Sequence, residues 1–393
     1  MKVFRLSVLF SCLVLPWNAI ANVWKDECVS YYQLKLPENL EVAVYPVEDF
    51  VNPDERPASD RDIKVQRYAT PKIAFIKNNG LRDRYTGQVQ FSQFYYDKYE
   101  LGISSESPEM IDFPAYIEKV KDDKFFWNNV RKQYENRSFR VLNKPVTPDA
   151  EFNRRYGYLI KEYPDAFTIY GSRGYTVYIN KDNRLYHFWG DFQKETNDKS
   201  QTAQKQLRDN EPEVLSLLNR FQPRNLYEVP TEQGFCFPYG FIAGDSGHEK
   251  RNMGVTYRLK DHPDVTIFFQ DLGMEPNAGK EKDLNEKDYV TWLWNWQYQW
   301  SSVSKELIRP KWRTIEMDGR KGVGTFVKSV FKDGRTDYGY VAYVQGNHSA
   351  RNQEPDLLLY VMQYSRQAKG HPPMDKDELE KMAERIVRSV HRR

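Results

Sequence analysis

Alternation of apolar and polar residues predicts strands through the first half of the chain. Residues 40–44, 73–76 and 89–96 place apolar side chains two residues apart, the period of a strand with one buried face. The clearest hairpin joins residues 175–179 to residues 185–189 through a turn containing Asn and Asp, which tolerate turn conformations.

The second half repeats this pattern. Residues 255–259 and 265–269 alternate on either side of a turn, and a second hairpin joins residues 325–331 to residues 338–344. Residues 357–362 form a continuous apolar run, which predicts a central strand buried on both faces.

Three segments have helical periodicity. One extends from Pro114 to about Tyr134. The second is predicted to begin at Asn210 as the capping residue, with Pro212 in the first turn, and to end before Pro223. The third follows Asp375 as a capping residue and places on one face Leu379, Met382, Ala383, Ile386, Val387 and Val390.

Hairpins interleaved with a few helices predict an α+β fold rather than repeated βαβ units. The proline-containing stretch 222–230 lacks periodicity, so we expect a domain boundary there. The predicted organisation is two domains, residues 22–228 and 229–393, each a mostly antiparallel sheet with packed helices.

The first residues predict export. Lys2 and Arg5 precede a short apolar run at residues 6–15 and a small-residue exit at residues 19–21, the layout of a secretory signal peptide cleaved after Ala21. An alternative is lipid attachment through Cys12, although this cysteine lies inside the apolar run.

Composition excludes one class of partner. The chain has 58 basic and 55 acidic residues, and removal of Lys2 and Arg5 leaves a nearly neutral mature chain. Nucleic-acid binders normally have a strong basic excess, so we expect no nucleic-acid partner. The 15% aromatic content suits sheet faces and protein interfaces.

Two cysteines, Cys28 and Cys236, remain after the predicted leader. In an oxidising compartment they tend to pair, and the bridge would close a loop of about two hundred residues. Two buried free cysteines are the alternative. Neither has a second cysteine two residues away, so a zinc knuckle is excluded.

Candidate catalytic motifs have simpler interpretations. Gly244–His248 resembles a serine nucleophile loop, but its composition is that of a turn. Gly319–Gly324 lacks the Lys-Ser/Thr ending of a phosphate loop, so a tight turn is favoured. The six histidines show no metal-ligand spacing. We therefore assign no catalytic, metal or cofactor residue.

One aromatic segment is a candidate partner-binding surface. It contains Trp292, Trp294, Trp296, Tyr298 and Trp300, which share one face if the segment is a strand. A helix would instead align Trp292, Trp296 and Trp300. Core or inter-domain packing is the first interpretation, a partner-binding face the second, and a sugar-stacking platform the third.

Two blocks carry a family resemblance. Residues 24–37 place a cysteine before a strand ending in Leu-Pro, and residues 229–242 repeat a cysteine in Gly-Phe-Cys-Phe-Pro. With residues 262–265, 355–359 and 375–393 in the same order, the chain resembles the immunity proteins of type VI secretion lipase effectors, the Tle cognate immunity proteins of family 4. Ser30 stands where that family suggests a glycine near the cysteine.

The resemblance implies a non-catalytic periplasmic protein, without cofactors, whose partner is a phospholipase effector. Its two domains would grip the effector and block the cap and active-site entrance. The alternative from another class is an exported glycan-binding or glycan-cleaving protein that uses the Trp292–Trp300 segment.

Overall fold

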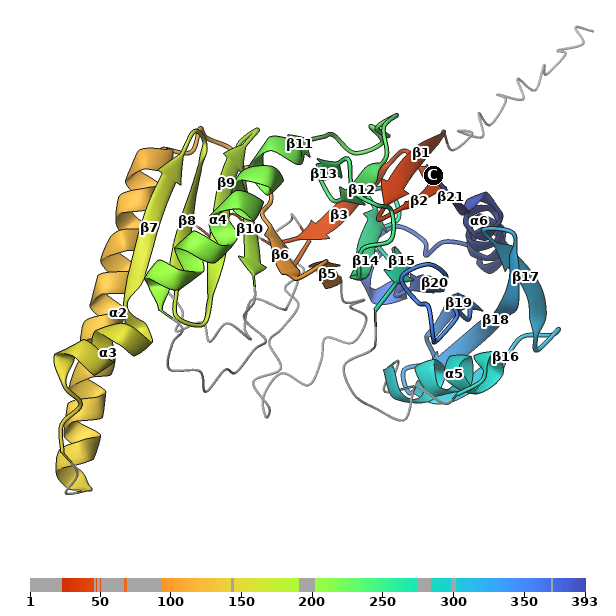
Figure 1. Ribbon diagram of the computed structural model, residues 1–393. Helices are drawn as coiled ribbons and strands as arrows, with labels where there is room; N and C mark the ends of the chain where they lie inside the picture. Colours follow the sequence, from red (N-terminus) through yellow and green to blue (C-terminus); the bar gives the residue numbers. More distant parts are fainter. Residues whose placement is uncertain are drawn as a thin grey trace, which may run out of the picture.

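The computed structural model describes residues 23–45, 47, 50, 67–68, 93–142, 145–190, 202–274, 284–297, 302–368 and 370–393. Their strands form one 15-stranded sheet and two three-stranded sheets (Figure 1). All pairings between these strands are antiparallel, and helices pack on the sheets. The predicted α+β class is confirmed.

We call one half of the large sheet, with its helices, the N-lobe. It comprises β5 (Gln93–Tyr96), β6 (Tyr99–Ile103), β7 (Tyr158–Tyr163), β8 (Ala166–Gly171), β9 (Gly174–Lys181), β10 (Arg184–Gly190), α2 (Phe113–Val141), α3 (Asp149–Tyr156) and α4 (Ala203–Arg220). The predicted hairpin is β9–β10, whose turn residues Asp182 and Asn183 have φ angles of 51° and 55°. This left-handed pair is the conformation that Asn and Asp tolerate in tight hairpins.

The C-lobe is the other half. It comprises β14 (Arg251–Leu259), β15 (Val265–Leu272), β16 (Ser302–Leu307), β17 (Arg313–Met317), β18 (Arg320–Phe331), β19 (Thr336–Val344), β20 (Asp356–Gln363), α5 (Glu286–Trp292), η4 (Leu293–Gln297), η5 (Ser365–Gln367) and α6 (Lys376–Ser389). All eight residues of β20 are buried, and the strand lies between β19 and β15. The apolar run at residues 357–362 is therefore the predicted central strand.

The remaining strands lie between or beside the lobes: β1 (Trp24–Val29), β2 (Tyr32–Pro37), β3 (Leu40–Val44), β4 (Arg67–Tyr68), β11 (Phe221–Pro223), β12 (Gly234–Phe237), β13 (Gly240–Ala243) and β21 (His391–Arg392). Both β3 and β5 pair with β14, and β2 pairs with β21. The large sheet thus continues across the boundary expected near residue 228, and the division into two domains stays a prediction.

The predicted start of the second helix is wrong. Helix α4 begins at Ala203, and the Thr202 side chain accepts a hydrogen bond from the Lys205 N–H. Asn210 lies inside the helix, where its amide donates to the Gln206 carbonyl, and Pro212 is also internal. The prediction relied on the preference of proline for a first turn, whereas this helix extends through its proline.

The other two helices are confirmed with adjusted ends. Helix α2 continues to Val141, beyond the predicted end near Tyr134. Asp375 caps α6 by accepting from the backbone N–H groups of Asp377 and Glu378, and α6 ends at Ser389. The predicted leader with Cys12, and the strand expected at 73–76, lie outside the described residues. In the described part of the chain, no helix is long and apolar enough to cross a membrane.

Candidate interaction surface

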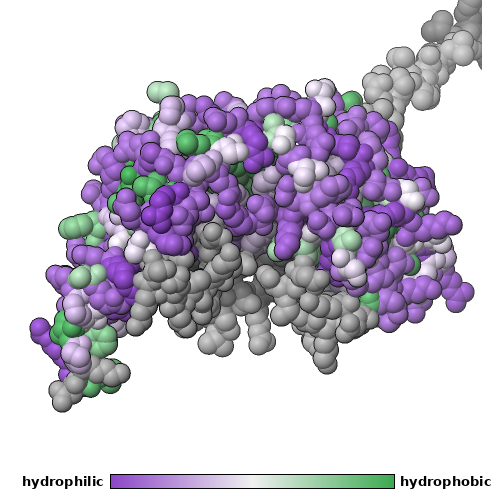
Figure 2. All heavy atoms as spheres, in the orientation of Figure 1, coloured by the Kyte–Doolittle hydropathy of each residue, from purple (hydrophilic) through white to green (hydrophobic). Residues whose placement is uncertain are grey.

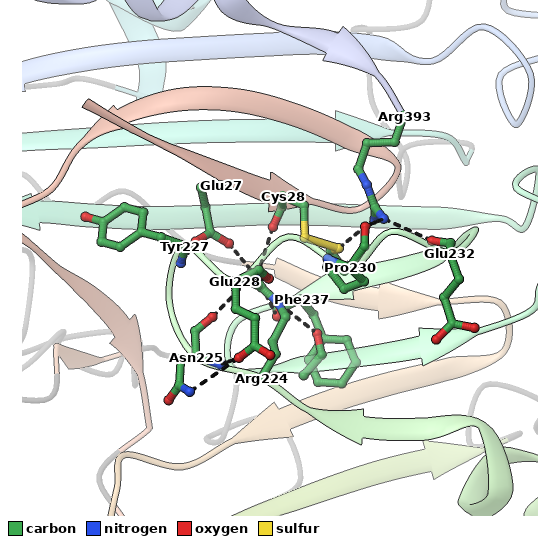
Figure 3. Close-up of a disulfide and its surroundings, with 12 residues drawn as sticks. Glu27, Cys28, Arg224, Asn225, Tyr227, Glu228, Pro230, Glu232, Phe237 and Arg393 are labelled. Carbon is green, nitrogen blue, oxygen red and sulfur yellow. Dashed lines mark hydrogen bonds and ion pairs between the residues drawn. A yellow bond between two sulfur atoms is a disulfide. The ribbon is translucent and has the colours of Figure 1, made fainter. Parts of the chain in front are cut away.

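A covalent and ionic joint ties β1 to β12 (Figure 3). Cys28 and Cys236 form a disulfide across a sequence separation of 208 residues, and both are fully buried. Ser30 and Cys236 add two backbone hydrogen bonds of 2.7 and 2.9 Å. The structure thus contains the bridge that the sequence favours.

Arg224 is the polar centre of this joint. Its guanidinium donates to the Glu27 carboxylate at 2.5 Å, the Cys28 carbonyl at 3.0 Å and the Phe237 carbonyl at 3.2 Å. The Arg224 and Glu27 side chains are only 3% and 0% exposed. A buried pair needs extra hydrogen bonds to offset the loss of water, and Arg224 makes them to several backbone carbonyls. The joint is therefore structural.

The Gly244–His248 segment is a turn. The Ser246 hydroxyl donates to Glu249 at 2.8 Å, so its described partner is a carboxylate and not a histidine base. Asp245 accepts hydrogen bonds from the hydroxyls of Tyr31 and Tyr96 at 2.7 and 3.1 Å. This arrangement packs strands together, and among the described residues the side-chain partner of Ser246 is Glu249.

Two further motifs also have structural roles. Asp318 and Gly319, with φ angles of 55° and 68°, form the tight turn between β17 and β18. His187 is buried with its Nε2 at 3.1 Å from the Tyr116 hydroxyl, and burial lowers the pKa of its imidazole to about 3. Within the described ranges, no three His, Cys, Asp or Glu side chains lie close enough to hold a metal ion.

The aromatic segment at residues 292–300 is helical as far as Gln297, through α5 and the π-helix η4. The strand alternative is therefore wrong for this part of the segment, which is helical. The alignment of Trp292, Trp296 and Trp300 that a helix predicts stays a prediction. The side chain of Trp296, and the whole of Tyr298 and Trp300, lie outside the described structure.

Trp294 is a core residue. It is 5% exposed, and its indole N–H donates to the Thr325 hydroxyl at 2.8 Å. Trp292 is partly buried and stacks on Tyr289, with ring centroids 5.8 Å apart. Core packing, the first interpretation, describes Trp294, which offers no exposed ring for sugar stacking.

Among the described residues, most of the large exposed apolar side chains lie on α2 or at its end. This helix outruns the sheet and projects from the N-lobe with α3 beside it (Figure 1). We call residues 124–142 together with α3 the arm. In Figure 2, hydrophobic residues (green) gather at the projecting end of the arm, whereas most of the visible surface is hydrophilic (purple). The large exposed apolar side chains of the arm are Phe125 (66%), Phe126 (57%), Trp127 (45%), Tyr134 (73%), Val141 (79%) and Leu142 (60%).

Helix α3 braces one side of the arm. Asn128 donates to the Tyr156 carbonyl at 2.9 Å, and the Tyr156 hydroxyl donates to Glu135 at 2.8 Å. Lys132 pairs with Asp149 at 2.8 Å. Burial and then the hydrogen bond to Glu135 raise the pKa of Tyr156, which keeps its phenol a donor. The arm is thus a supported helix pair.

A shallow groove of about 420 Å³ lies along α2, next to the side that α3 contacts. It is lined by Trp127, Val130, Arg131, Tyr134, Glu135, Ser138 and Phe139. This surface was not among the sequence predictions, although the sequence contains a signal for it: Phe113, Val120, Trp127, Tyr134 and Val141 are each seven residues apart. That spacing gives an apolar stripe along a helix.

Residues 228–393 match the family described as Tle cognate immunity protein 4 C-terminal domain. No curated protein sequence matches the chain.

Several solved structures share the fold. The immunity protein TplEi of the type VI secretion system of Pseudomonas aeruginosa, complexed with the "L" peptide, has 14% identity and a TM-score of 0.52, with 94% of this chain and 98% of that chain covered. A chain of the Tle4–Tli4 complex has 15% identity and a TM-score of 0.52, with 94% and 97% covered. At such identity the likeness shows the fold alone. The match over residues 228–393 to the C-terminal domain of Tle cognate immunity protein 4 confirms, for this part of the chain, the resemblance found in the sequence.

Proposed function

We propose that this chain is a periplasmic immunity protein that binds a cognate type VI secretion phospholipase and inhibits it. The observation that carries the proposal is the family match over residues 228–393. The shared fold over 94% of the chain extends the likeness to the N-lobe. One of the matched structures is a complex by its name, Tle4 with Tli4, and another holds a peptide.

The proposed mechanism is a grip that covers the cap and active-site entrance of the lipase. A lipase must expose an apolar site to reach lipid, so holding its cap in place stops catalysis without any chemistry by the inhibitor. Protection by equimolar binding needs slow dissociation, and hence an interface of roughly 2,000 Å² or more.

The placement of the lobes supports this mechanism. The arm and α5 lie at opposite ends of the molecule and both extend toward the lower side of the view in Figure 1. The joint at Cys28, Cys236, Arg224 and Glu27 fixes the chain between the lobes, so less conformational entropy is lost on gripping. Trp292, partly exposed at the end of α5, remains a proposed contact on the C-lobe.

The periplasmic location rests on the disulfide, because such bonds persist in oxidising compartments. We expect the chain to be exported by residues 1–21. N-terminal sequencing of protein purified from the periplasm should then begin at Asn22.

The test is co-purification of the exported chain with the lipase-like product of the adjacent gene, followed by a phospholipase assay on vesicles. An equimolar complex with hydrolysis abolished is expected. No complex together with undiminished hydrolysis would refute the proposal for that effector.

A further inference from the structure

Helix α2 is longer than the sheet it packs against. Its 29 residues span about 43 Å at 1.5 Å per residue, whereas the six residues of the neighbouring edge strand β7 span about 20 Å. The buried residues of α2, Tyr116, Ile117 and Val120, all lie in its first third. The rest of the helix therefore projects past the sheet.

Part of the face that packs on the sheet continues along the projecting part and stays exposed there, whereas α3 covers the adjoining part. Residues seven apart lie on the same side of a helix, with a drift of about 20°. Along one such series, the exposed fraction rises from 6% at Val120 to 45% at Trp127, 73% at Tyr134 and 79% at Val141. We call Trp127, Val130, Tyr134 and Val141 the stripe. The stripe has the apolar character of a face that packs in a core, but the described residues leave it exposed.

The stripe is held in place. Helix α3 uses the adjacent side of α2, through Asn128, Lys132 and Glu135, and leaves the stripe open. Because the arm is already ordered, a partner that binds the stripe loses little entropy in fixing it.

The charge of the arm indicates which kind of partner surface would be complementary to the stripe. Residues 124–142 contain five basic side chains and one acidic side chain, a formal net charge of +4, in a chain whose overall charge is +3. Arg137 and Arg140 are exposed, and Arg137, three residues after Tyr134 and four before Val141, lies next to the stripe. Complementarity therefore calls for a partner with an apolar centre and an acidic margin.

Building on the proposed function, we propose that the stripe of α2 binds the lipase effector, on an apolar, acid-rimmed surface beside its active-site entrance. A second copy of this chain is disfavoured because two arms of charge +4 would repel. An anionic membrane is disfavoured because the stripe borders a groove, which a protruding protein side chain fills, and because Glu135 lines that groove.

The test compares two variants of the exported full-length chain for affinity to the purified effector, by calorimetry or surface plasmon resonance. The first is Trp127→Ala with Tyr134→Ala, which removes two exposed rings of the stripe. The matched control is Phe125→Ala, another exposed aromatic of the same helix, which points about 160° away from Trp127.

We expect the double variant to bind at least 30-fold more weakly, the factor typical of a lost interface hot spot, about 2 kcal/mol. Phe125→Ala should stay within about threefold of the wild type, and both variants should keep the wild-type melting temperature because the replaced rings are exposed. Wild-type affinity in the double variant would overturn the inference while leaving the proposed function standing. Failure of the wild-type chain to bind would instead refute the proposed function.

Two further measurements exclude the other occupants. Sedimentation with phosphatidylglycerol vesicles should leave the protein in the supernatant, and sedimentation velocity should show no self-association that the double variant removes. Vesicle binding or dimerisation that depends on Trp127 and Tyr134, with effector affinity unchanged in the double variant, would overturn the inference.

Discussion

Replacement of Arg224 by methionine tests whether the joint between β1 and β12 is held by its buried charge pair. Methionine keeps much of the length and apolar stem of arginine but removes every N–H donor of the guanidinium. Glu27, whose side chain is fully buried, then loses its cationic partner. The carbonyls of Cys28 and Phe237 lose a donor at the same time.

The expected cost is large for one substitution. Removal of one partner from a buried ion pair destabilises a protein by about 3–5 kcal/mol, because the other charge stays in a site without water. Typical domains are stable by only about 5–15 kcal/mol. We therefore expect Arg224→Met to lose a substantial fraction of the stability of this part of the fold.

A second substitution separates the charge effect from lost packing. Glu27→Gln removes the stranded charge and still offers an oxygen to the Tyr227 backbone N–H, which Glu27 accepts at 2.5 Å. The double variant Arg224→Met/Glu27→Gln should therefore recover at least half of the loss, a coupling of about 1.5 kcal/mol or more. Urea unfolding followed by tryptophan fluorescence, with the disulfide intact, measures each variant. A cost below about 1 kcal/mol for Arg224→Met, or strictly additive costs in the double variant, would refute the reasoning.

Three other predictions use the same assay. Cys28→Ala/Cys236→Ala should destabilise the chain by up to about 5 kcal/mol, from the loop of 208 residues that the bridge closes, and an unchanged urea midpoint would contradict this. Burial lowers the pKa of His187 to about 3, so neutral His187 contributes fully to the free energy of unfolding above pH 6.5. This contribution is lost as pH falls toward 3, by at most about 1.4 kcal/mol per pH unit. His187→Gln should therefore make the free energy of unfolding depend less on pH between 6.5 and 3, and equal pH dependence in the variant and the wild type would refute this. Trp294→Phe should cost about 1 kcal/mol for the lost bond to Thr325, and Trp294→Ala about 3–5 kcal/mol; a cost below about 1 kcal/mol for Trp294→Ala would show that this ring is not part of the core.

Local patterns predicted the elements whose causes are local. The turn at Asp182 and Asn183 depends on two residues that accept positive φ, and the cap of α6 depends on Asp375 and its own first turn. The buried strand β20 could be predicted because, in a protein made mostly of sheets, a continuous apolar run of that length is typical of a strand buried on both faces. Each of these signals lies within a window of about ten residues.

The errors and omissions arise where distant segments decide. Asn210 and Pro212 have the composition of a helix start, yet α4 begins a full two turns earlier, at Ala203. The pairing of β3 and β5 with β14 brings together residues more than 150 positions apart, for which the sequence has no local signal. The Trp292–Trp300 segment was a candidate surface because of its aromatic content and spacing, although Trp294 is buried.

The stripe shows how an exposed apolar surface can escape a sequence search. Trp127 and Tyr134 have the same apolar periodicity as Val120, and periodicity cannot tell which of them the sheet covers. Only the difference in length between α2 and β7 separates a core face from an open one. For a protein whose proposed task is to hold another protein, such a mismatch is more informative than any motif, because binding needs a rigid apolar surface and not a reactive group. The same argument explains why the joint at Arg224 and the stripe at Trp127 should differ in their response to substitution. Replacement of Arg224 should lower the stability of the fold. Replacement of Trp127 should lower the affinity for the effector and leave the folded chain unchanged.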